Sequence, residues 1–336
     1  MTHISRWDLD KTYLRTEFAT VRDLVRTAFE RADEKRTNPG AATLLRELSR
    51  AGITIHILSG SPEQMRSRLE DKLRLDGIRW DAFTLKPNLK NVLRLRFRAV
   101  KDQLGYKLPA LLRARLGAPQ DAAANMHETL FGDDAEADAF VYSLYADIMA
   151  GRVGEELVHT VCELGRVYED VREDTLRWVR LVKPDKVVER ILIHLEQQTA
   201  PDDFHVYGSR VVPFYNYLQA AFVVHEDGRL PADGVLRVAA ELVTQHRFDG
   251  DALARSYAEL ARRGHLAGTK IDALQDALVA WDSNAAARGR EELSRMIERL
   301  PEHAATAKKH YRGNRELSSP DYASLVSAHN ARRKKK

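Results

Sequence analysis

Short apolar runs alternate with helix-periodic segments over the first 150 residues, and this alternation constrains the fold more than any other feature of the chain. A strand buried on both faces reads as a short run of β-branched residues and leucine, and the crossover between parallel strands reads as an amphipathic helix. We therefore predict an α/β fold with a parallel sheet. The predicted strands cover 3–10, 53–60, 80–85 and 126–134, and the predicted helices cover 18–36, 61–75, 106–116 and 135–151.

The character of the sequence changes from about residue 155. Helix-periodic segments then follow one another, separated by Pro, Gly and Asp, with no fixed repeat. We predict a first domain over 1–152 and an all-helical second domain over 153–318, which would serve as a cover or as a partner-binding module. Residues 319–336 end in "ARRKKK" and are predicted to form a basic, flexible tail.

Composition excludes several classes of protein. The 336 residues are 44% hydrophobic and 30% charged, as in ordinary globular proteins, and no apolar run reaches the roughly 18 residues that span a bilayer. The single Cys162 lies on a helix-periodic apolar stripe and is predicted to be a buried thiol. The twelve histidines show no zinc-site spacing. We expect a cytoplasmic protein, either free or peripheral at a membrane.

Basic residues are unevenly placed, although the formal net charge is only +4. They gather in 90–116 and in the last six residues, 331–336. Either these segments are a solvated helix face and a frayed tail, or they form a surface that meets phosphates, lipid headgroups or nucleic acid. Composition does not decide between the two interpretations.

Two aspartates, Asp8 and Asp10, stand two apart in "WDLDKT" at the predicted end of the first strand. Side chains two apart on a strand point to one face, and open parallel sheets bind ligands outside their carboxyl ends. One carboxylate there could attack an electrophile or hold a metal while the other moves protons. The alternative is a surface turn with capping aspartates, and this pair alone does not exclude it.

Three further groups of polar residues follow in order along the chain. Ser59 ends the second predicted strand, Lys107 stands near the start of a predicted helix, and "GDDAEAD" (132–138) ends the fourth strand. We expect the strand-end groups to meet at one edge of the sheet. A hydroxyl donor, a fixed cation and an acidic metal cradle facing an aspartate pair are what phosphoryl transfer requires.

Some of these placements have alternatives. Ser61 is predicted to cap a helix that begins at Pro62, with Gln64 completing a capping box, which leaves Ser59 as the phosphate ligand. Gly60 would let a phosphate approach the backbone near that helix N-terminus. Three other lysines could replace Lys107 as the cation: Lys86, Lys90 and Lys101.

Together these motifs resemble those of the haloacid dehalogenase superfamily of aspartyl phosphotransferases, over roughly residues 1–150. Within it, "DLDKT", "ILSGSPEQM" and "LFGDDAEAD" are most similar to the actin-patch-type, lipin-like phosphatidate phosphatases. The resemblance implies a Rossmann-like three-layer core. The short spacing between Asp10 and Ser59 leaves no room for a separate cap, which in this superfamily implies access for large substrates.

The resemblance also implies roles for particular residues. Asp8 would be the nucleophile, and Asp10 the general acid and then the base for water. Thr12 would steady the loop, and Ser59 would hydrogen-bond the transferring phosphoryl group. Lys107 would neutralise negative charge on Asp8 and on that group.

The resemblance also implies a magnesium site. Asp133 would hold Mg²⁺ together with Asp8 and the backbone carbonyl of Asp10, because this hard cation prefers oxygen ligands. Asp134 or Asp138 would be the second acidic partner, and the sequence offers both.

The resulting expectation is a Mg²⁺-dependent phosphomonoester hydrolase that works through an aspartyl phosphate, on phosphatidate or another bulky phosphorylated substrate. The alternatives are a binding or scaffold protein of the same fold without efficient catalysis, and a phosphotransferase with an acceptor other than water. A nucleic-acid partner is not expected, because residues 126–151 read as strand then helix and not as the hairpin of a GDD-type polymerase. No GxxxxGK[ST] nucleotide motif occurs, and the sequence does not indicate an oligomeric state.

Overall fold

The computed structural model of the chain describes residues 2–15, 36–86, 100–117, 126–281, 287–313 and 319–334. The helix predicted over 18–36 lies almost entirely outside these residues, as does the basic stretch 90–99. Among the described residues, no helix is both long enough and apolar enough to cross a bilayer.

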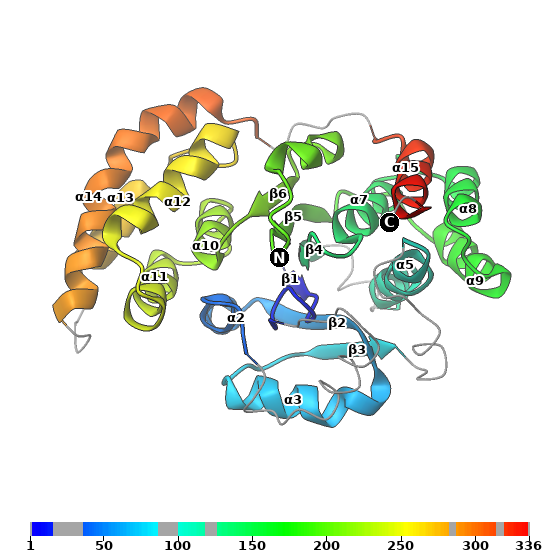
Figure 1. The fold of residues 1–336 in the computed structure, drawn as a ribbon, viewed down its shortest axis with the longest axis horizontal. Coiled ribbons are helices and arrows are strands. Elements are labelled where there is room, and N and C mark those ends of the chain that lie inside the picture. Colours follow the sequence, from blue (N-terminus) through cyan, green and yellow to red (C-terminus); the bar gives the residue numbers. More distant parts are fainter. Residues whose placement is uncertain are drawn as a thin grey trace.

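A six-stranded, all-parallel sheet forms the centre of the molecule, in the order β3-β2-β1-β4-β5-β6 (Figure 1). The strand order reverses between β1 and β4, which makes this the switch point of a doubly wound sheet. The strands are β1 (Thr2–Trp7), β2 (Thr54–Pro62), β3 (Ala82–Lys86), β4 (Met126–Asp133), β5 (Val188–His194) and β6 (Val211–Phe214).

Helices cover one face of the sheet in two layers (Figure 1). Trp7, Ile57, Phe131 and Leu192 point from the strands into this layer, and Trp7 stacks on Phe131 with ring centroids 3.9 Å apart. The helices of this side are α2 (Ala41–Arg50), α3 (Arg66–Leu75), α10 (Tyr217–Glu226), α11 (Ala232–His246), α12 (Gly250–Arg263), α13 (Ile271–Val279) and α14 (Ala287–His310).

The opposite face is covered by helices from the middle and the end of the chain (Figure 1). Leu58, Leu130, Ile191 and Ile193 point into it, so successive residues of β5 face opposite layers, as strand geometry requires. The helices are α5 (Val100–Leu116), α7 (Asp138–Met149), α8 (Glu155–Leu164), α9 (Glu169–Arg180) and α15 (Tyr322–Lys334). Cys162 is a buried free thiol within α8, as predicted.

The predicted fold class is confirmed: the core is α/β with a parallel sheet, and helices follow it. The predicted all-helical region 153–318 is wrong at two places, because β5 and β6 continue the same sheet beyond residue 152. In "VERILIH" a short apolar run fits a helix period as well as a buried strand. β6 has only four residues and contains Pro213, which is tolerated there because β6 is an edge strand.

The predicted flexible tail is also wrong over 319–334. This segment contains α15, whose Tyr322 is fully buried and donates a hydrogen bond to Asp147 Oδ2 at 2.7 Å. Tyr322 also packs edge-on against Phe140 of α7. The aromatic anchor therefore holds the C-terminal helix against the core, despite its basic end.

Candidate active site

The proposed site residues come together at the carboxyl edge of the sheet, around the switch point. Asp8 directly follows β1, and Asp133 is the last residue of β4. The two strands stay paired up to this point, because the Asp8 amide donates to the Phe131 carbonyl at 3.0 Å. The residues after β1 are Asp-Leu-Asp, whereas dinucleotide-binding sheets carry a glycine-rich turn there.

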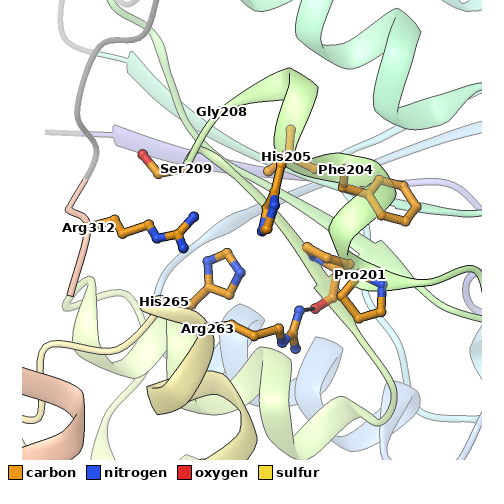
Figure 2. A pocket seen from close by; sticks show the side chains of 10 residues that line it. Pro201, Phe204, His205, Gly208, Ser209, Arg263, His265 and Arg312 are labelled. Carbon is orange, nitrogen blue, oxygen red and sulfur yellow. Dashed lines mark hydrogen bonds between the residues drawn. The ribbon is translucent and has the colours of Figure 1, made fainter. Parts of the chain in front are cut away.

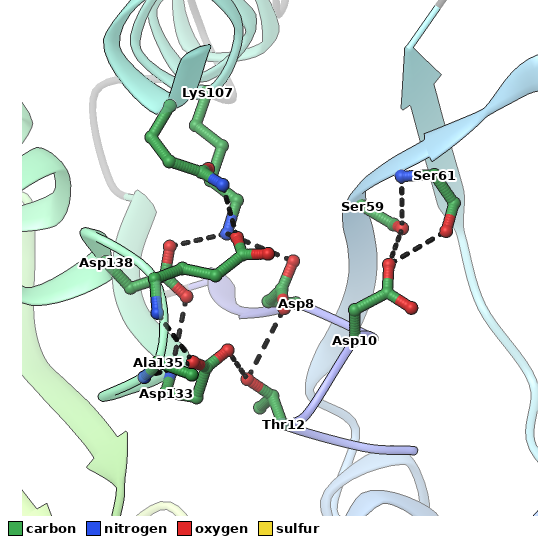
Figure 3. A network of polar contacts seen from close by, with 11 residues as sticks. Asp8, Asp10, Thr12, Ser59, Ser61, Lys107, Asp133, Ala135 and Asp138 are labelled. Carbon is green, nitrogen blue, oxygen red and sulfur yellow. Dashed lines mark hydrogen bonds and ion pairs between the residues drawn. The ribbon is translucent and has the colours of Figure 1, made fainter. Parts of the chain in front are cut away.

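Lys107 is the cation of this site (Figure 3). It lies on α5 with no exposed surface, and its ammonium nitrogen is 3.2 Å from Asp8 Oδ1 and 3.0 Å from Glu136 Oε2. It also donates a hydrogen bond to Asp138 Oδ1. Of the alternative lysines, Lys86 lies over the Tyr106 ring at 5.9 Å, and the side chains of Lys90 and Lys101 are outside the described residues.

Four carboxylates surround this lysine: Asp8, Asp133, Glu136 and Asp138 each offer an oxygen, and these oxygens lie within 4.8 Å of one another. Asp133 Oδ1 accepts hydrogen bonds from the Ala135 and Glu136 amides at 2.7 and 3.0 Å, which fixes the turn that returns Glu136 to the cluster. We call these four acids and Lys107 the acid cluster.

Gly132 makes room for Asp138. A Cβ atom at Gly132 would lie 2.5 Å from Asp138 Oδ2, so any larger residue would displace that carboxylate. The same oxygen accepts a hydrogen bond from the Asp133 amide at 3.2 Å. The glycine of "GDD" is thus explained by the close packing of Asp138 against the end of β4.

The charges of the acid cluster do not balance. Burial, together with the neighbouring acids, raises the pKa of Asp8 and of Asp133 well above the usual range, despite the opposing effect of Lys107. Burial likewise raises the pKa of Asp138 to about 6. Burial alone would lower the pKa of Lys107, but Asp138, Asp8 and Glu136 outweigh it and raise that pKa. One cation is therefore not enough for four buried acids.

These residues fit a bound divalent cation. The donor atoms are all carboxylate oxygens, the set that Mg²⁺ prefers, and Asp8 Oδ1 has an ion pair with Lys107 but no hydrogen bond of good geometry among the described residues. Asp8, Asp133, Glu136 and Asp138 would be the ligand candidates. Glu136 was not predicted from the sequence, although it lies inside the quoted "GDDAEAD".

Asp134, the alternative to Asp138, faces another partner. Its carboxylate accepts hydrogen bonds from the Gln197 and Thr199 amides at 2.8 and 3.0 Å, in the loop after β5. The structure thus brings Asp138, and not Asp134, to Asp8 and Lys107.

Asp10 and two serines form a second group beside the acid cluster (Figure 3). Asp10 is half-buried, and its Oδ2 accepts hydrogen bonds from Ser61 Oγ at 2.8 Å and from Ser59 Oγ at 3.1 Å. The Ser61 amide in turn donates to Ser59 Oγ at 3.0 Å. The hydroxyls of β2 therefore orient the second aspartate of the motif.

The predicted cap at Ser61 is wrong. β2 continues to Pro62, a 3-10 turn, η1 (Glu63–Met65), follows, and α3 begins only at Arg66. Gly60 thus lies within a strand and not beside a helix N-terminus, and a Cβ atom there would meet no atom within 4 Å. The strand extends because Pro62 pairs with Lys86 of β3 beyond a register shift.

Contacts from distant segments hold the loop of Lys11 and Thr12, which follows Asp10. Lys11 has a left-handed backbone, with φ of 62°, which costs energy for a residue with a side chain. The Thr12 carbonyl accepts hydrogen bonds from Asn38 Nδ2 and Tyr217 Oη, both at 2.6 Å. The Lys11 carbonyl lies 3.2 Å from His194 Nδ1. None of these three partners was predicted from the sequence.

Thr12 also faces the acid cluster. Its hydroxyl lies 3.3 Å from Asp133 Oδ2 and 3.4 Å from Asp8 Oδ2, at the long end of hydrogen-bond distances. The role of Thr12 in steadying the loop stays a prediction.

A cavity of about 260 Å³ adjoins the acid cluster. Asp133 and Glu136 line one end, and the remaining walls come from α7, α15 and the 3-10 segment η2 (Pro201–Tyr207). Phe140, Val206 and Leu325 make these walls largely apolar.

In comparisons with family models, with curated proteins and with solved structures, the chain matches none of them significantly.

Proposed function

We propose that the protein is a Mg²⁺-dependent phosphomonoester hydrolase that transfers the phosphoryl group to Asp8 and then to water. The observation that carries this proposal is the position of Lys107: it is fully buried and paired with Asp8 at the switch point, between three further acids. A fixed cation beside a carboxylate removes the repulsion that keeps an anionic nucleophile from a phosphate. The magnesium ion, when bound, supplies further neutralisation of the phosphoryl oxygens.

The reaction would proceed in two displacements. A carboxylate oxygen of Asp8 attacks phosphorus, the bond to the leaving oxygen breaks, and Asp10 gives that oxygen a proton. Asp10 then takes a proton from water, which attacks the phosphoryl group and releases phosphate and free Asp8. Both serine hydrogen bonds end on Asp10 Oδ2, and they would orient the carboxyl group that meets the leaving oxygen.

The cavity beside the acid cluster bears on the substrate class. Its apolar walls support a leaving group with an apolar part next to the phosphate, whereas Asp134 and Asp203, which also line it, disfavour additional negative charge. A volume of about 260 Å³ cannot enclose two acyl chains, so a phosphatidate-like substrate would extend out of it.

The structure of the described part of the basic segment 90–116 gives less support to binding at an acidic membrane than its sequence suggested. Lys107 and Arg115 are buried, and Arg115 donates to the Met126 carbonyl at 3.0 Å. Arg113 is paired with Asp174 at 3.1 Å. Of the basic side chains that the structure describes in this segment, two are thus buried and the third is exposed but paired with an acid.

Asp8→Asn tests the proposal most directly. We expect p-nitrophenyl phosphate hydrolysis with Mg²⁺ to fall at least about a thousandfold, because the nucleophile is lost. Asp71→Asn, on the exposed side of α3, is the matched control and should leave turnover unchanged. Acid-quenched wild-type protein should carry a phosphoryl group on the Asp8 peptide in mass spectra. Full activity in Asp8→Asn would contradict the proposal.

The alternatives predict different products. A phosphotransferase would pass the phosphoryl group to an added alcohol in preference to water, whereas a hydrolase releases inorganic phosphate in proportion to substrate consumed. A binding or scaffold protein would retain substrate affinity without turnover. A panel of phosphatidate, sugar phosphates, nucleotides and phosphopeptides, analysed for both products, separates these cases and identifies the substrate class.

A further inference from the structure

A second cavity, of about 300 Å³, is lined in part by residues of the edge strand β6 and by none of the acid cluster (Figure 2). It is enclosed by η2, the turn after α12 and the turn after α14. Phe204 and Pro213 contribute apolar walls, and Arg263, His265 and Arg312 contribute polar groups. We call it the β6 cavity; its volume is at the lower end of the range of small-molecule sites.

His265 is the unusual residue of this cavity. It is only 9% exposed, its ring is directed into the cavity in Figure 2, and it has no hydrogen-bond partner within the described parts of the chain. Burial, followed by the nearby Arg263, Arg190 and Arg312, lowers the pKa of His265 well below its usual value, so the ring is neutral. A neutral imidazole keeps one N–H donor, so a ligand acceptor in the cavity could receive a hydrogen bond from His265.

The two arginines of the cavity differ in how much positive charge they can offer. Arg263 is neutralised by Glu259, whose Oε1 lies 2.6 Å from the guanidinium, and it also donates to the Pro213 carbonyl at 2.7 Å. Arg312 is exposed, and no carboxylate among the described residues lies within ion-pair distance of it. Among the described residues, the cavity thus offers the exposed guanidinium of Arg312 beside one neutral N–H donor from His265.

We propose that the β6 cavity binds a small organic monoanion whose carboxylate contacts Arg312 and His265 and whose apolar body packs against Phe204 and Pro213. A single guanidinium matches one negative charge, and a bidentate arginine pair suits the planar carboxylate. A phosphate dianion would retain one uncompensated charge beside apolar walls. This inference does not depend on the proposed phosphatase activity.

Titration of the full-length protein with benzoate, benzamide and inorganic phosphate tests this proposal, with calorimetry or ligand-observed NMR as the readout. We expect saturable one-site binding of benzoate at millimolar concentration or below, about tenfold weaker binding of the uncharged benzamide, and still weaker binding of phosphate. Absence of saturable benzoate binding would overturn the proposal, as would equal affinity for benzoate and benzamide. Tighter binding of phosphate would contradict the monoanion assignment.

Variants then locate the site. Arg312→Gln should weaken benzoate binding about tenfold, because it removes the available charge. Arg262→Gln is the matched control, since Arg262 is also exposed, lies next to Arg263 and does not line the cavity. His265→Gln, which keeps an N–H donor, should bind benzoate more tightly than His265→Phe. Equal effects of the two arginine variants would place the binding elsewhere and overturn the assignment, and thermal unfolding confirms that each variant is folded.

Discussion

Two buried charge clusters lie around β1, β4 and α5, and they differ in how their carboxylates are paired. In the acid cluster, Lys107 of α5 faces Asp8 after β1, Asp133 at the end of β4, and Glu136 and Asp138 beyond it. The second cluster lies within the sheet, before these strand ends. There Arg6 of β1 and Arg115 of α5 face Glu128 of β4, so two cations meet one acid.

The second cluster is internally satisfied. Arg6 donates to both carboxylate oxygens of Glu128, at 2.9 and 3.0 Å, and Tyr145 donates to the same carboxylate at 3.0 Å. Burial alone would raise the pKa of Glu128, but Arg6 and Arg115 outweigh it and lower that pKa. In the acid cluster the pKa values of Asp8 and Asp133 rise instead. Buried charge is thus common to both clusters, and the raised pKa values of its carboxyls distinguish the acid cluster as the candidate functional site.

Replacing Lys107 should produce the largest change. In Lys107→Met we expect turnover to fall about a thousandfold and the free energy of unfolding to fall by about 3 to 5 kcal/mol at pH 7, because buried acids lose their only cation. Steady-state kinetics and urea unfolding measure the two effects. A variant with wild-type turnover would show that the lysine is structural only.

Replacing Glu128 tests the second cluster, where we expect a loss of stability without a loss of turnover. Glu128→Gln leaves two buried arginines without a matching charge, so the free energy of unfolding should fall by about 3 kcal/mol. Turnover of the folded fraction should stay close to that of the wild type, because Glu128 lies outside the acid cluster. Urea unfolding and kinetics below the transition test this; a thousandfold loss of turnover would remove the functional distinction between the two clusters.

The pH dependence of stability should separate the clusters further. The folded-state pKa of Asp138 is about 6 against 3.8 for the free side chain, so the native state binds more protons and metal-free stability should fall as pH rises through this window. The pKa values of Asp8 and Asp133 are raised in the same way. Glu128, with its lowered pKa, has the opposite sign: its stabilisation is lost as pH falls below about 4.

Melting temperatures in a chelator between pH 4 and 7, with and without Mg²⁺, measure this effect. Saturating Mg²⁺ should stabilise the protein by about 2 to 3 kcal/mol at a hundredfold excess over its dissociation constant, and more at pH 7 than at pH 5. An equal gain at both pH values, or no gain, would argue against metal binding by the acid cluster.

The smallest expected effect concerns the loop beside the acid cluster. Tyr217→Phe removes one hydrogen bond to the Thr12 carbonyl and should cost about 1 kcal/mol of stability together with a severalfold loss of turnover. Tyr257→Phe is the matched control, since Tyr257 donates to Glu226 outside the site. If both variants lower stability equally and neither lowers turnover, the contact has no positioning role.

Sequence patterns located the first four strands and missed the later two. Asp8 and Asp133 were predicted because they follow or end apolar strand runs. Ser59 was placed at the end of its strand and Lys107 near the start of its helix, but β2 continues to Pro62 and α5 begins at Val100. β5 was missed because its short apolar run fits two periodicities, and its strand form depends on pairing with β4. Ser61 was misassigned because its local capping pattern is weaker than the pairing of β2 with β3.

The contacts that shape the Lys11 loop could not be predicted from the sequence. Asn38, His194 and Tyr217 all bind main-chain carbonyls, and any residue type at positions 11 and 12 offers the same carbonyl. Glu136 had a visible signal, since it lies in the acidic turn. Its return to Lys107, however, depends on amide hydrogen bonds to Asp133 that only the folded turn provides.

The bond between Tyr217 and Thr12 also has a consequence for folding during synthesis. It joins residues 205 positions apart, so a growing chain that has completed β1 to β4 already has Asn38 at the Thr12 carbonyl but still lacks Tyr217. Contacts of such long sequence separation form late and slowly. The nascent protein thus assembles its acidic strand ends and the Asn38 contacts first, and it completes the contacts of the Thr12 carbonyl only after β6 and the start of α10 have left the ribosome.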